Sequence, residues 1–404
     1  MAAMISAIVP TYQRSHYLAE TLDALISQTR PLHQIIIWDD GSTDATHDVA
    51  RAAIQAAPSV VSYHRDVNGG KSRALNKAMA HATGDYIWIC DDDDLSLRDA
   101  AERLGSVLDT TAVDLSGAPH LRFSTPQDGG DRVVVDAGYW PDLRQGSVLR
   151  HTLEDMFFFQ NGSLVRRAAF DRVGPFREDL ARSIDLDMTV RLLARGPAHI
   201  LDDPVFLQRK HDGARGPAAA RHAAARSEEV WRDADRGIFQ ALRGVLPLSL
   251  YGAMFAGDDP KLVHRAALIQ RATVYARRCD WTAALTDFAA AADHCPNEPL
   301  TRLEWDIAIR AMAGKHGAAD AFTPPTRAGL REIARKGPAA QAITRGLARG
   351  ARWRLRAALQ DRETPSAVQI ARFIAAFGIG TMSAPVANNR LRERSTLPSE
   401  AYAW

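Results

Sequence analysis

Stretches typical of β-strands alternate with stretches typical of helices over residues 5–90. Apolar runs rich in β-branched residues lie at 5–9, 35–38, 60–64 and 86–90, and apolar residues with helical spacing lie at 17–27, 43–57 and 72–82. This alternation constrains the fold, because strands joined by helices form a parallel sheet that the helices cover on both faces. We therefore expect an α/β domain at the start of the chain.

Polar clusters follow three of these predicted strands, at the point where each strand ends. They are Thr11-Tyr12, Asp39-Asp40 and the run Asp91–Asp94. Ligands of open α/β sheets bind beyond the carboxyl ends of the strands. The three clusters are therefore expected to converge on one crevice.

The four consecutive aspartates Asp91–Asp94 follow the apolar run 86–90. Two carboxylates about 4 Å apart repel each other by about 1 kcal/mol in water and by about 4 kcal/mol at partial burial. A divalent cation removes this repulsion, and Mg²⁺ prefers oxygen ligands that it shares with phosphates. The alternative is a solvated acidic loop next to the N-terminus of a helix that begins near Leu95.

The charge of the chain changes sign near the middle. Residues 1–214 carry 22 basic and 30 acidic side chains, a net of −8, whereas residues 215–404 carry 28 and 18, a net of +10. Gly213, Gly216 and Pro217 interrupt the periodicity at the same place. We expect a first domain over residues 1–214, a helical domain over 215–385 and a tail over 386–404.

The three cysteines, Cys90, Cys279 and Cys295, have no metal-type spacing, and their odd number argues against a disulfide framework. A reducing, cytoplasmic location fits this pattern best. No basic surface interleaved with aromatic residues is recognisable, so we expect no nucleic-acid partner.

Residues 265–298 have the spacing of one tetratricopeptide repeat. The small, aromatic and proline positions of such a repeat are occupied by Ala272, Tyr275, Ala284, Phe288, Ala291 and Pro296. A single repeat cannot bury its own faces, so neighbouring helices must pack on it.

Five motifs, in order and with matching spacing over residues 1–210, resemble the inverting family 2 glycosyltransferases with the GT-A fold. The motifs are Ile8–Arg14, Asp39–Asp44, Asn68–Asn76, Gly84–Tyr86 with Asp91–Asp94, and Gly174–Leu192. The resemblance implies a doubly wound mixed α/β sheet followed by an all-α domain. It also implies transfer of a sugar from a nucleotide-diphospho-sugar to an acceptor hydroxyl, in the synthesis of a surface polysaccharide or glycoconjugate.

The resemblance places the nucleotide at the first two motifs. Pro10, Thr11, Tyr12 and Arg14 would line its pocket. Asp39 would accept a hydrogen bond from the base, most simply N3 of uracil, which favours a UDP-sugar, and Asp40 or Ser42 would lie near the ribose. A turn with helix capping is the structural alternative for Asp39–Ser42, because these residue types favour turns and N-caps.

Lys71 and Arg73 follow two glycines and would meet the pyrophosphate, since small residues let the backbone approach and cations offset phosphate charge. A solvated helix start is the alternative.

The Asp-x-Asp element of the family is implied at Asp91 and Asp93. Asp93 would be the direct ligand of Mn²⁺ or Mg²⁺, Asp91 would contact the metal or the ribose, and Asp92 would be the intervening residue. His211 corresponds to a family histidine that completes the metal shell or reaches the diphosphate, although a lone histidine in a loop is often only solvated.

Asp185 lies where the family has its general base, which takes the proton of the acceptor hydroxyl. Ile184 and Leu186 stand where the family usually has Glu and an aromatic residue, and this departure concerns the acceptor contacts rather than the base. Asp187 is the alternative base or a structural carboxylate. The structural alternative for both residues is a negatively charged first turn that stabilises the N-terminus of a helix.

The acceptor, which could be a saccharide, a lipid-linked sugar or a protein, is not indicated. The segment Arg327–Arg362 carries ten basic residues and two acidic ones. This segment could contact anionic lipid at the inner face of a membrane or another partner, or it could be a solvated basic surface. Two other functions are alternatives to sugar transfer: nucleotidyl transfer, and a non-catalytic scaffold that acts through its helices.

Overall fold

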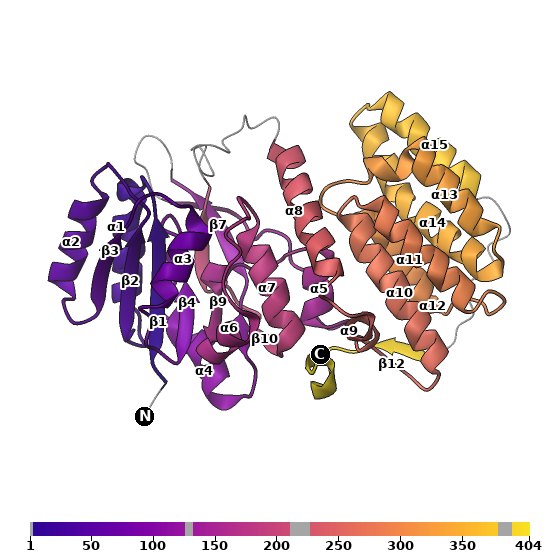
Figure 1. Cartoon of the computed structure of the whole chain (residues 1–404). Coiled ribbons are helices and arrows are strands. Elements are labelled where there is room, and N and C mark those ends of the chain that lie inside the picture. The colour runs from indigo at the N-terminus through magenta and orange to yellow at the C-terminus, as the bar shows by residue number, and fades with distance from the viewer. Residues whose placement is uncertain (1–2, 126–131, 211–226, 379–389) are drawn as a thin grey trace. The chain divides into compact units, whose positions relative to one another are not determined.

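The computed structural model describes residues 3–125, 132–210, 227–378 and 390–404 (Figure 1). The chain divides into two compact units. Unit 1 comprises Met1–Asp142 and Met156–Ala223, and unit 2 comprises Leu143–Asp155 and Ala224–Trp404.

The centre of unit 1 is a seven-stranded sheet in the order β10-β6-β9-β4-β1-β2-β3. Its strands are β1 (Ile5–Thr11), β2 (Gln34–Asp39), β3 (Val61–Arg65), β4 (Tyr86–Ile89), β6 (Leu115–Gly117), β9 (Ser163–Arg166) and β10 (Ala198–Ile200). All pairs are parallel except those that β9 makes with β4 and β6. The sheet is therefore mixed, and the predicted fold class is confirmed.

Helices lie on both faces of this sheet. They are α1 (Ser15–Ile26), α2 (Thr46–Ala56), α3 (Lys71–Met79), α4 (Ala100–Thr110), α6 (Arg167–Val173) and α7 (Ile184–Arg195). Ile5, Ala7 and Val9 of β1 point to one face and pack with α1 and α4, because alternate residues of a strand share a face. The helix α3 contacts β1 and β2 without joining that cluster.

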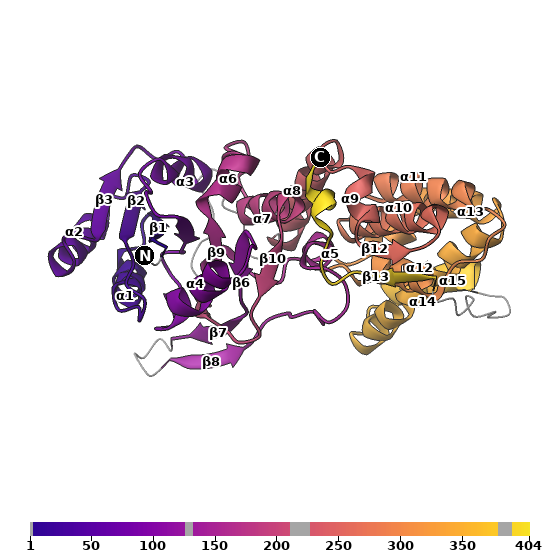
Figure 2. The same cartoon turned by 90° about the horizontal axis from the view of Figure 1, so that it is seen from below.

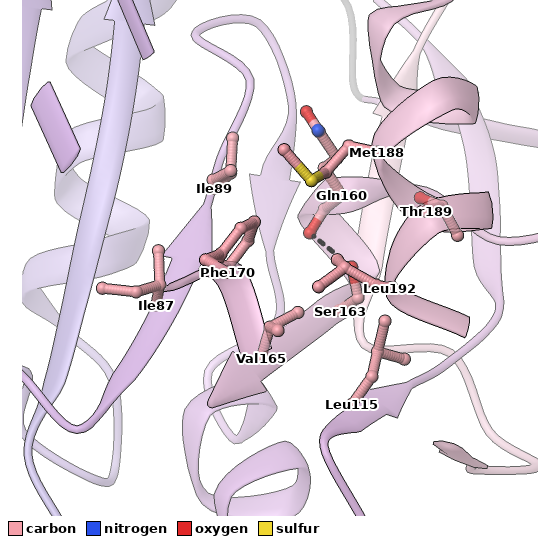
Figure 3. A pocket seen from close by; sticks show the side chains of 10 residues that line it. All are labelled: Ile87, Ile89, Leu115, Gln160, Ser163, Val165, Phe170, Met188, Thr189 and Leu192. Atoms are coloured by element: carbon pink, nitrogen blue, oxygen red, sulfur yellow. Dashed lines mark hydrogen bonds between the residues drawn. The ribbon is translucent and has the colours of Figure 1, made fainter. Parts of the chain in front are cut away.

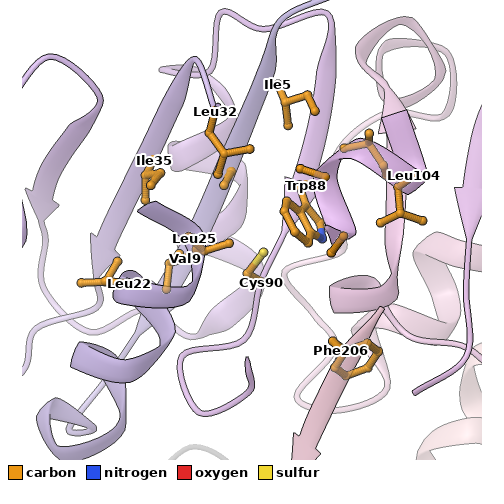
Figure 4. Packing of buried hydrophobic residues seen from close by; sticks show 14 of the residues in the cluster. Ile5, Val9, Leu22, Leu25, Leu32, Ile35, Trp88, Cys90, Leu104 and Phe206 are labelled. Atoms are coloured by element: carbon orange, nitrogen blue, oxygen red, sulfur yellow. The ribbon is translucent and has the colours of Figure 1, made fainter. Parts of the chain in front are cut away.

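Figure 4 shows the main core of unit 1, in which Leu22 and Leu25 of α1 and Leu104 of α4 surround strand residues. Trp88 of β4 is fully buried there, and its indole N–H donates to the Asn161 carbonyl at 2.9 Å. Burial of a large apolar side chain contributes about 1.5–3 kcal/mol, so this core fixes β4 and the aspartates that follow it.

A second, smaller sheet has the order β5-β11-β7-β8. Its strands are β5 (Leu95–Ser96), β7 (His120–Ser124), β8 (Val133–Asp136) and β11 (Phe206–Arg209), and Figure 2 shows β7 beside β8. The expectation of a helix that begins near Leu95 is wrong, because Leu95 and Ser96 pair with Leu207 and Phe206.

Unit 2 is mostly helical. Its α-helices are α5 (Val148–Glu154), α8 (Ser227–Arg243), α9 (Leu248–Gly252), α10 (Pro260–Arg277), α11 (Trp281–His294), α12 (Arg302–Arg310), α13 (Pro324–Ala334), α14 (Pro338–Gln360) and α15 (Thr364–Gly378). It also contains a two-stranded antiparallel sheet of β12 (Phe255–Gly257) and β13 (Leu391–Glu393), so it is not purely α. The strand β13 lies in the segment that we expected to be a tail.

The segment Leu143–Asp155 joins unit 2 through buried ion pairs. Glu154 lies 3.0 Å from Arg310, and Arg310 lies 2.7 Å from Glu393, the last residue of β13. Asp155 pairs with Arg277 of α10. The charge change at residue 214 gave no sign of this earlier crossing of the chain into unit 2.

The repeat-like segment 265–298 forms the helix pair α10 and α11, which pack on each other. Ala272, Tyr275, Ala284, Phe288 and Ala291 are all buried, as the spacing predicts. The tetratricopeptide assignment itself stays a prediction.

Within the described ranges, no helix combines the length and the apolar character that crossing a bilayer would require.

Candidate active site

The carboxyl ends of β1, β2 and β4 meet at one edge of the large sheet. Thr11 pairs in register with Asp39, and the Asp40 N–H donates to the Thr11 carbonyl at 2.9 Å. On the other side of β1, the Cys90 N–H donates to the Ile8 carbonyl at 2.9 Å. The three predicted polar clusters therefore converge, and Pro10 and Thr11 are buried between them while Tyr12 is half-buried.

Asp39 is 1% exposed and is held by its own turn. One carboxylate oxygen accepts the Ser42 N–H at 2.8 Å, and the other accepts the Tyr63 hydroxyl at 2.6 Å. Burial and this hydrogen bond raise the pKa of Tyr63. Asp39 therefore stabilises a turn, as the structural alternative stated. Its contact with the base of a nucleotide stays a prediction.

Asp40 binds the backbone of the glycine loop. Its two carboxylate oxygens accept the N–H groups of Gly69 and Gly70, each at 2.8 Å. Gly70 has a φ of +87°, which L side chains rarely adopt, so glycine is required there. Asp40 therefore fixes the start of α3, from which Lys71 projects.

Ser42 accepts a hydrogen bond from the backbone of the loop that follows β1. The Gln13 N–H donates to Ser42 Oγ at 2.9 Å, and Gln13 Nε2 donates to Thr43 Oγ1 at 2.7 Å. Gln13 belongs to the motif Ile8–Arg14 but was not predicted as a site residue. Its backbone has a left-handed φ of +56°, and the sequence gives no sign of this conformation.

The acidic run divides into two accessible and two buried carboxylates. Asp91 forms an ion pair with Lys71, and Asp93 forms one with Arg14; their side chains are 35% and 18% exposed. Asp92 and Asp94 are buried. Burial raises the pKa of Asp92 to about 7, and burial together with the charges of Asp91 and Asp93 raises the pKa of Asp94 well above its usual value.

Arg209 is a buried residue that holds the acidic run and that sequence reasoning did not select. Its backbone N–H donates to Asp94 Oδ1 and its Nε donates to the Asp93 carbonyl, each at 2.8 Å. Its guanidinium lies 4.6 Å from the ring centres of both Tyr17 and Phe123. Nothing in the local pattern distinguishes this arginine from an exposed one.

Lys71 and Arg73 point to different surroundings, because residues two apart on a helix lie on different faces. Burial lowers the pKa of Lys71, but the charges of Asp91, Asp185 and Asp92 outweigh it and the pKa is raised. The Arg73 side chain instead lies against Gly69, with its NH2 group 3.9 Å from Asp66. Lys71 is therefore in the acidic site, whereas Arg73 lies beside the glycine loop.

Asp185 and Asp187, in the first turn of α7, differ in burial and pairing. Asp185 is half-buried, and its carboxylate accepts the Leu186 N–H at 2.9 Å. Asp187 is 1% exposed and lies 2.9 Å from Arg191 and 3.7 Å from Arg177. This arrangement favours the structural interpretation of Asp187, and the role of Asp185 as the base stays a prediction.

The donor set suits a metal that is shared with a ligand. Among the residues that the structure describes, no cluster of three or more metal-type side chains could hold an ion. Asp91 and Asp93 supply hard oxygen donors, and Mg²⁺ sites commonly use only one or two carboxylates together with substrate phosphates and water. His211, the third predicted ligand, lies outside the described residues.

A cavity of about 10 Å³ lies behind the sheet edge, between β4, β9 and α7 (Figure 3). Ile87, Ile89 and Leu192 line it, with Gln160 and Ser163 as polar neighbours. Such a volume holds about one water molecule, so this cavity is not a substrate pocket.

Comparisons with known proteins agree with this geometry. Residues 6–174 match the profile of Glycosyl transferase family 2. The chain is 35% identical over 104 residues to the glycosyltransferase GlyG of Streptococcus pneumoniae, a match that covers 26% of this chain and 35% of GlyG. It is 30% identical over 175 residues to the uncharacterized glycosyltransferase alr2836 of Nostoc sp., covering 42% of this chain and 53% of that protein. The chain thus aligns with about half or less of the length of these relatives.

Among solved structures, S. aureus TarS 1-349 in complex with UDP-GlcNAc superposes with a TM-score of 0.50 at 16% identity, covering 84% of this chain and 90% of that one. At this identity the likeness concerns the fold, and the predicted GT-A fold is confirmed.

Proposed function

Because residues 6–174 are a Glycosyl transferase family 2 domain, we propose that the protein transfers a sugar from a nucleotide-diphospho-sugar to an acceptor hydroxyl with inversion at the anomeric carbon. A UDP-sugar is the favoured donor, and the synthesis of a surface polysaccharide or glycoconjugate is the proposed setting. The acceptor is a saccharide, a lipid-linked sugar or a protein.

One observation carries this proposal: the carboxyl ends of β1, β2 and β4 meet at one edge of the sheet, where Lys71 forms an ion pair with Asp91. The charge of Asp185 also raises the pKa of Lys71, which supports placing the proposed donor residues and the proposed base in one site. This supports a site in which a phosphate-binding cation lies between the acidic run and the base.

Donor binding uses the two cations of the site. Lys71 and Arg14 are paired with Asp91 and Asp93, and both can transfer their hydrogen bonds to the anionic diphosphate. Asp40 keeps the backbone before Lys71 in position through Gly69 and Gly70. Mn²⁺ or Mg²⁺ held by Asp93 and Asp91 would neutralise the leaving diphosphate.

Asp185 is the proposed base of the transfer step. Its carboxylate takes the proton of the acceptor hydroxyl, the hydroxyl oxygen forms a bond to the anomeric carbon, and the bond from that carbon to the diphosphate oxygen breaks. The nucleoside diphosphate leaves with the electron pair of that bond. In-line attack from the opposite side inverts the configuration.

The test compares Asp185→Asn with Asp187→Asn and Asp93→Ala. We expect Asp185→Asn to lower kcat by at least about 10²-fold with little change in donor affinity, because general-base catalysis typically contributes 10²–10⁴-fold. Asp93→Ala should weaken donor binding in the presence of Mn²⁺. Asp187→Asn should mainly lower the melting temperature, because it disturbs the pairing with Arg191.

Turnover is measured with saturating UDP-sugar, and donor binding is measured separately by thermal shift across UDP- and GDP-sugars. Near-normal turnover of both Asp185→Asn and Asp93→Ala would contradict the assignment. Donor binding without transfer or hydrolysis by the unmodified protein would favour the scaffold alternative, and release of pyrophosphate would favour nucleotidyl transfer.

A further inference from the structure

The helix α14 of unit 2 carries five arginines and no acidic residue. One of them, Arg354, is turned inward: its guanidinium donates to the carbonyls of Met312 at 3.1 Å and Gly314 at 2.5 Å. The other four are Arg345, Arg349, Arg352 and Arg356. None of these four forms an ion pair with any residue in the described part of the chain.

The four outward arginines lie on one face of α14 together with apolar side chains. Positions 345, 349, 352, 356 and 359 repeat at intervals of three and four, and Trp353 lies four residues after 349 and three before 356, so the six positions form one stripe along the helix. Trp353 is 47% exposed and Leu359 is 62% exposed within this stripe, and Arg352, Leu355, Arg356, Leu359 and Gln360 border a shallow open hollow. We call this face the α14 stripe.

The opposite face of α14 is fixed in the core of unit 2. Ile343, Leu347 and Ala351 are buried there, and α15 packs alongside (Figure 1). The helix α15 contains no acidic residue and adds Arg372 and the 43% exposed Val368 on its outer side. The exposed acidic residues Asp361 and Glu363 lie in the turn between the helices, so they limit the stripe at one end.

We propose that the α14 stripe docks the protein on an anionic lipid bilayer surface. Four arginines without acidic partners complement phosphate headgroups, and each arginine near such a surface adds about a fivefold gain in affinity. Trp353 and Leu359 explain why the partner is a bilayer rather than a soluble polyanion. Exposed apolar side chains between cations gain by burial at the headgroup boundary, whereas a soluble polyanion would use the charge alone.

The test measures co-sedimentation of the full chain with phosphatidylcholine vesicles, with and without phosphatidylglycerol. We expect binding only to the anionic vesicles, and weaker binding as salt is raised, because salt screens exposed charges. No donor or acceptor is needed, so the result is independent of the proposed sugar transfer.

Two matched double variants locate the surface. Arg352→Glu/Arg356→Glu changes two exposed arginines four residues apart on α14, and Arg331→Glu/Arg335→Glu makes the same change at the C-terminal end of α13, where Arg335 directly follows the helix. The first should lower affinity for anionic vesicles by about 25-fold or more, and the second by less than about threefold. Because salt screens the arginines but not the apolar contact, Trp353→Ser should weaken the vesicle binding that remains at high salt. Circular dichroism melting of each variant checks folding.

Equal binding to neutral and anionic vesicles would overturn the proposal, as would an equal loss in the two double variants. Absence of any vesicle binding would also overturn it. If the Arg352→Glu/Arg356→Glu variant lost binding to heparin while neither it nor the unmodified protein bound vesicles, the stripe would serve a soluble polyanion instead.

Discussion

Asp40 illustrates at the scale of a residue what sequence reasoning could and could not predict. Its position after a buried strand marked it as a site residue. Its hydrogen bonds to Gly69 and Gly70 depend on how a loop distant in sequence returns to β2, and no local pattern encodes that approach. Arg209 was missed for the same reason, because its burial follows from β11 pairing beside β5 and β7.

Replacing Asp40 tests its role at the glycine loop. Asp40→Asn keeps one acceptor oxygen, so one of the two glycine N–H groups loses its partner. We expect a loss of about 1–3 kcal/mol in the free energy of unfolding, because an unsatisfied donor costs about that much. Urea unfolding measures it. Asp48→Asn, at an exposed aspartate of α2, is the control and should change stability by less than about 0.5 kcal/mol. Equal losses of stability in the two variants would contradict the role of Asp40 in holding the glycine loop.

His120 makes the stability of unit 1 depend on pH. It is 2% exposed, both ring nitrogens lack a hydrogen-bond partner in the described part of the chain, and burial lowers its pKa to about 4. Between pH 6.5 and 4 the unfolded chain binds a proton there that the folded protein does not. Stability is therefore lost as pH falls through this window, by at most about 3 kcal/mol.

The variant His120→Phe removes this titration and keeps an aromatic ring against Phe206, which lies 5.2 Å away between ring centres. We expect its free energy of unfolding to fall less between pH 7 and pH 4.5 than that of the unmodified protein. The exposed His199→Phe serves as the control. Identical pH profiles for His120→Phe and the unmodified protein would refute the assignment.

Among the elements, the alternation of strands and helices predicted β1 to β4 and α1 to α3, because helices separate these strands one after another along the chain. The strand β5 has two residues, and β6, β9 and β10 have three or four. A period of two is barely expressed over such lengths. The antiparallel insertion of β9 between β4 and β6 could therefore not be predicted from pattern alone, although the family resemblance implied a mixed sheet.

A buried ion pair joins α10 to α12. Arg265 and Glu304 are both 0% exposed and lie 2.7 Å apart, and Arg265 also donates to the Glu298 carbonyl at 2.8 Å. Arg265→Met leaves a buried charge unpaired and should cost about 3–5 kcal/mol. The double variant Arg265→Met/Glu304→Leu should cost less than the sum of the single variants by at least about 1 kcal/mol.

Chemical unfolding of all four proteins in this cycle gives the coupling energy. The exposed pair Arg302–Asp306 in α12, 2.9 Å apart, provides a matched cycle with an expected coupling below about 0.5 kcal/mol. A coupling as small at Arg265 and Glu304 would show that burial adds nothing to this pair.

In the whole molecule, the chain passes from unit 1 into unit 2 at residue 143, returns at 156 and leaves again at 224. The charge and composition change near residue 214 could indicate only the last of these passages. In the earlier passage the buried Glu154 contacts Gln270 of α10 and Arg310 of α12, and Arg150 pairs with Glu393 of β13, all of which follow much later in the chain. Such long-range pairing leaves no local signature.

A fragment of residues 1–223 tests this division. It keeps Leu143–Asp155 but lacks Arg310, which pairs with Glu154, and Arg277, which pairs with Asp155. We expect protease cleavage within residues 143–155 of the fragment but not of the full chain, because segments without packing partners open readily. A second fragment, in which a Gly-Ser linker replaces residues 143–155, should aggregate less. Equal resistance of this segment in the fragment and in the full chain would contradict the assignment to unit 2.

The interleaved path of the chain bears on how such a protein could have diversified. A gene fusion at a single junction could not join unit 1 to a different helical unit, because residues 143–155 belong to unit 2 while lying inside the stretch that matches Glycosyl transferase family 2. Recombination would have to exchange both pieces together. We therefore expect the coding regions of both units to be inherited together. Substitutions in residues 143–155 should be compensated by substitutions in the helices of unit 2 that contact them.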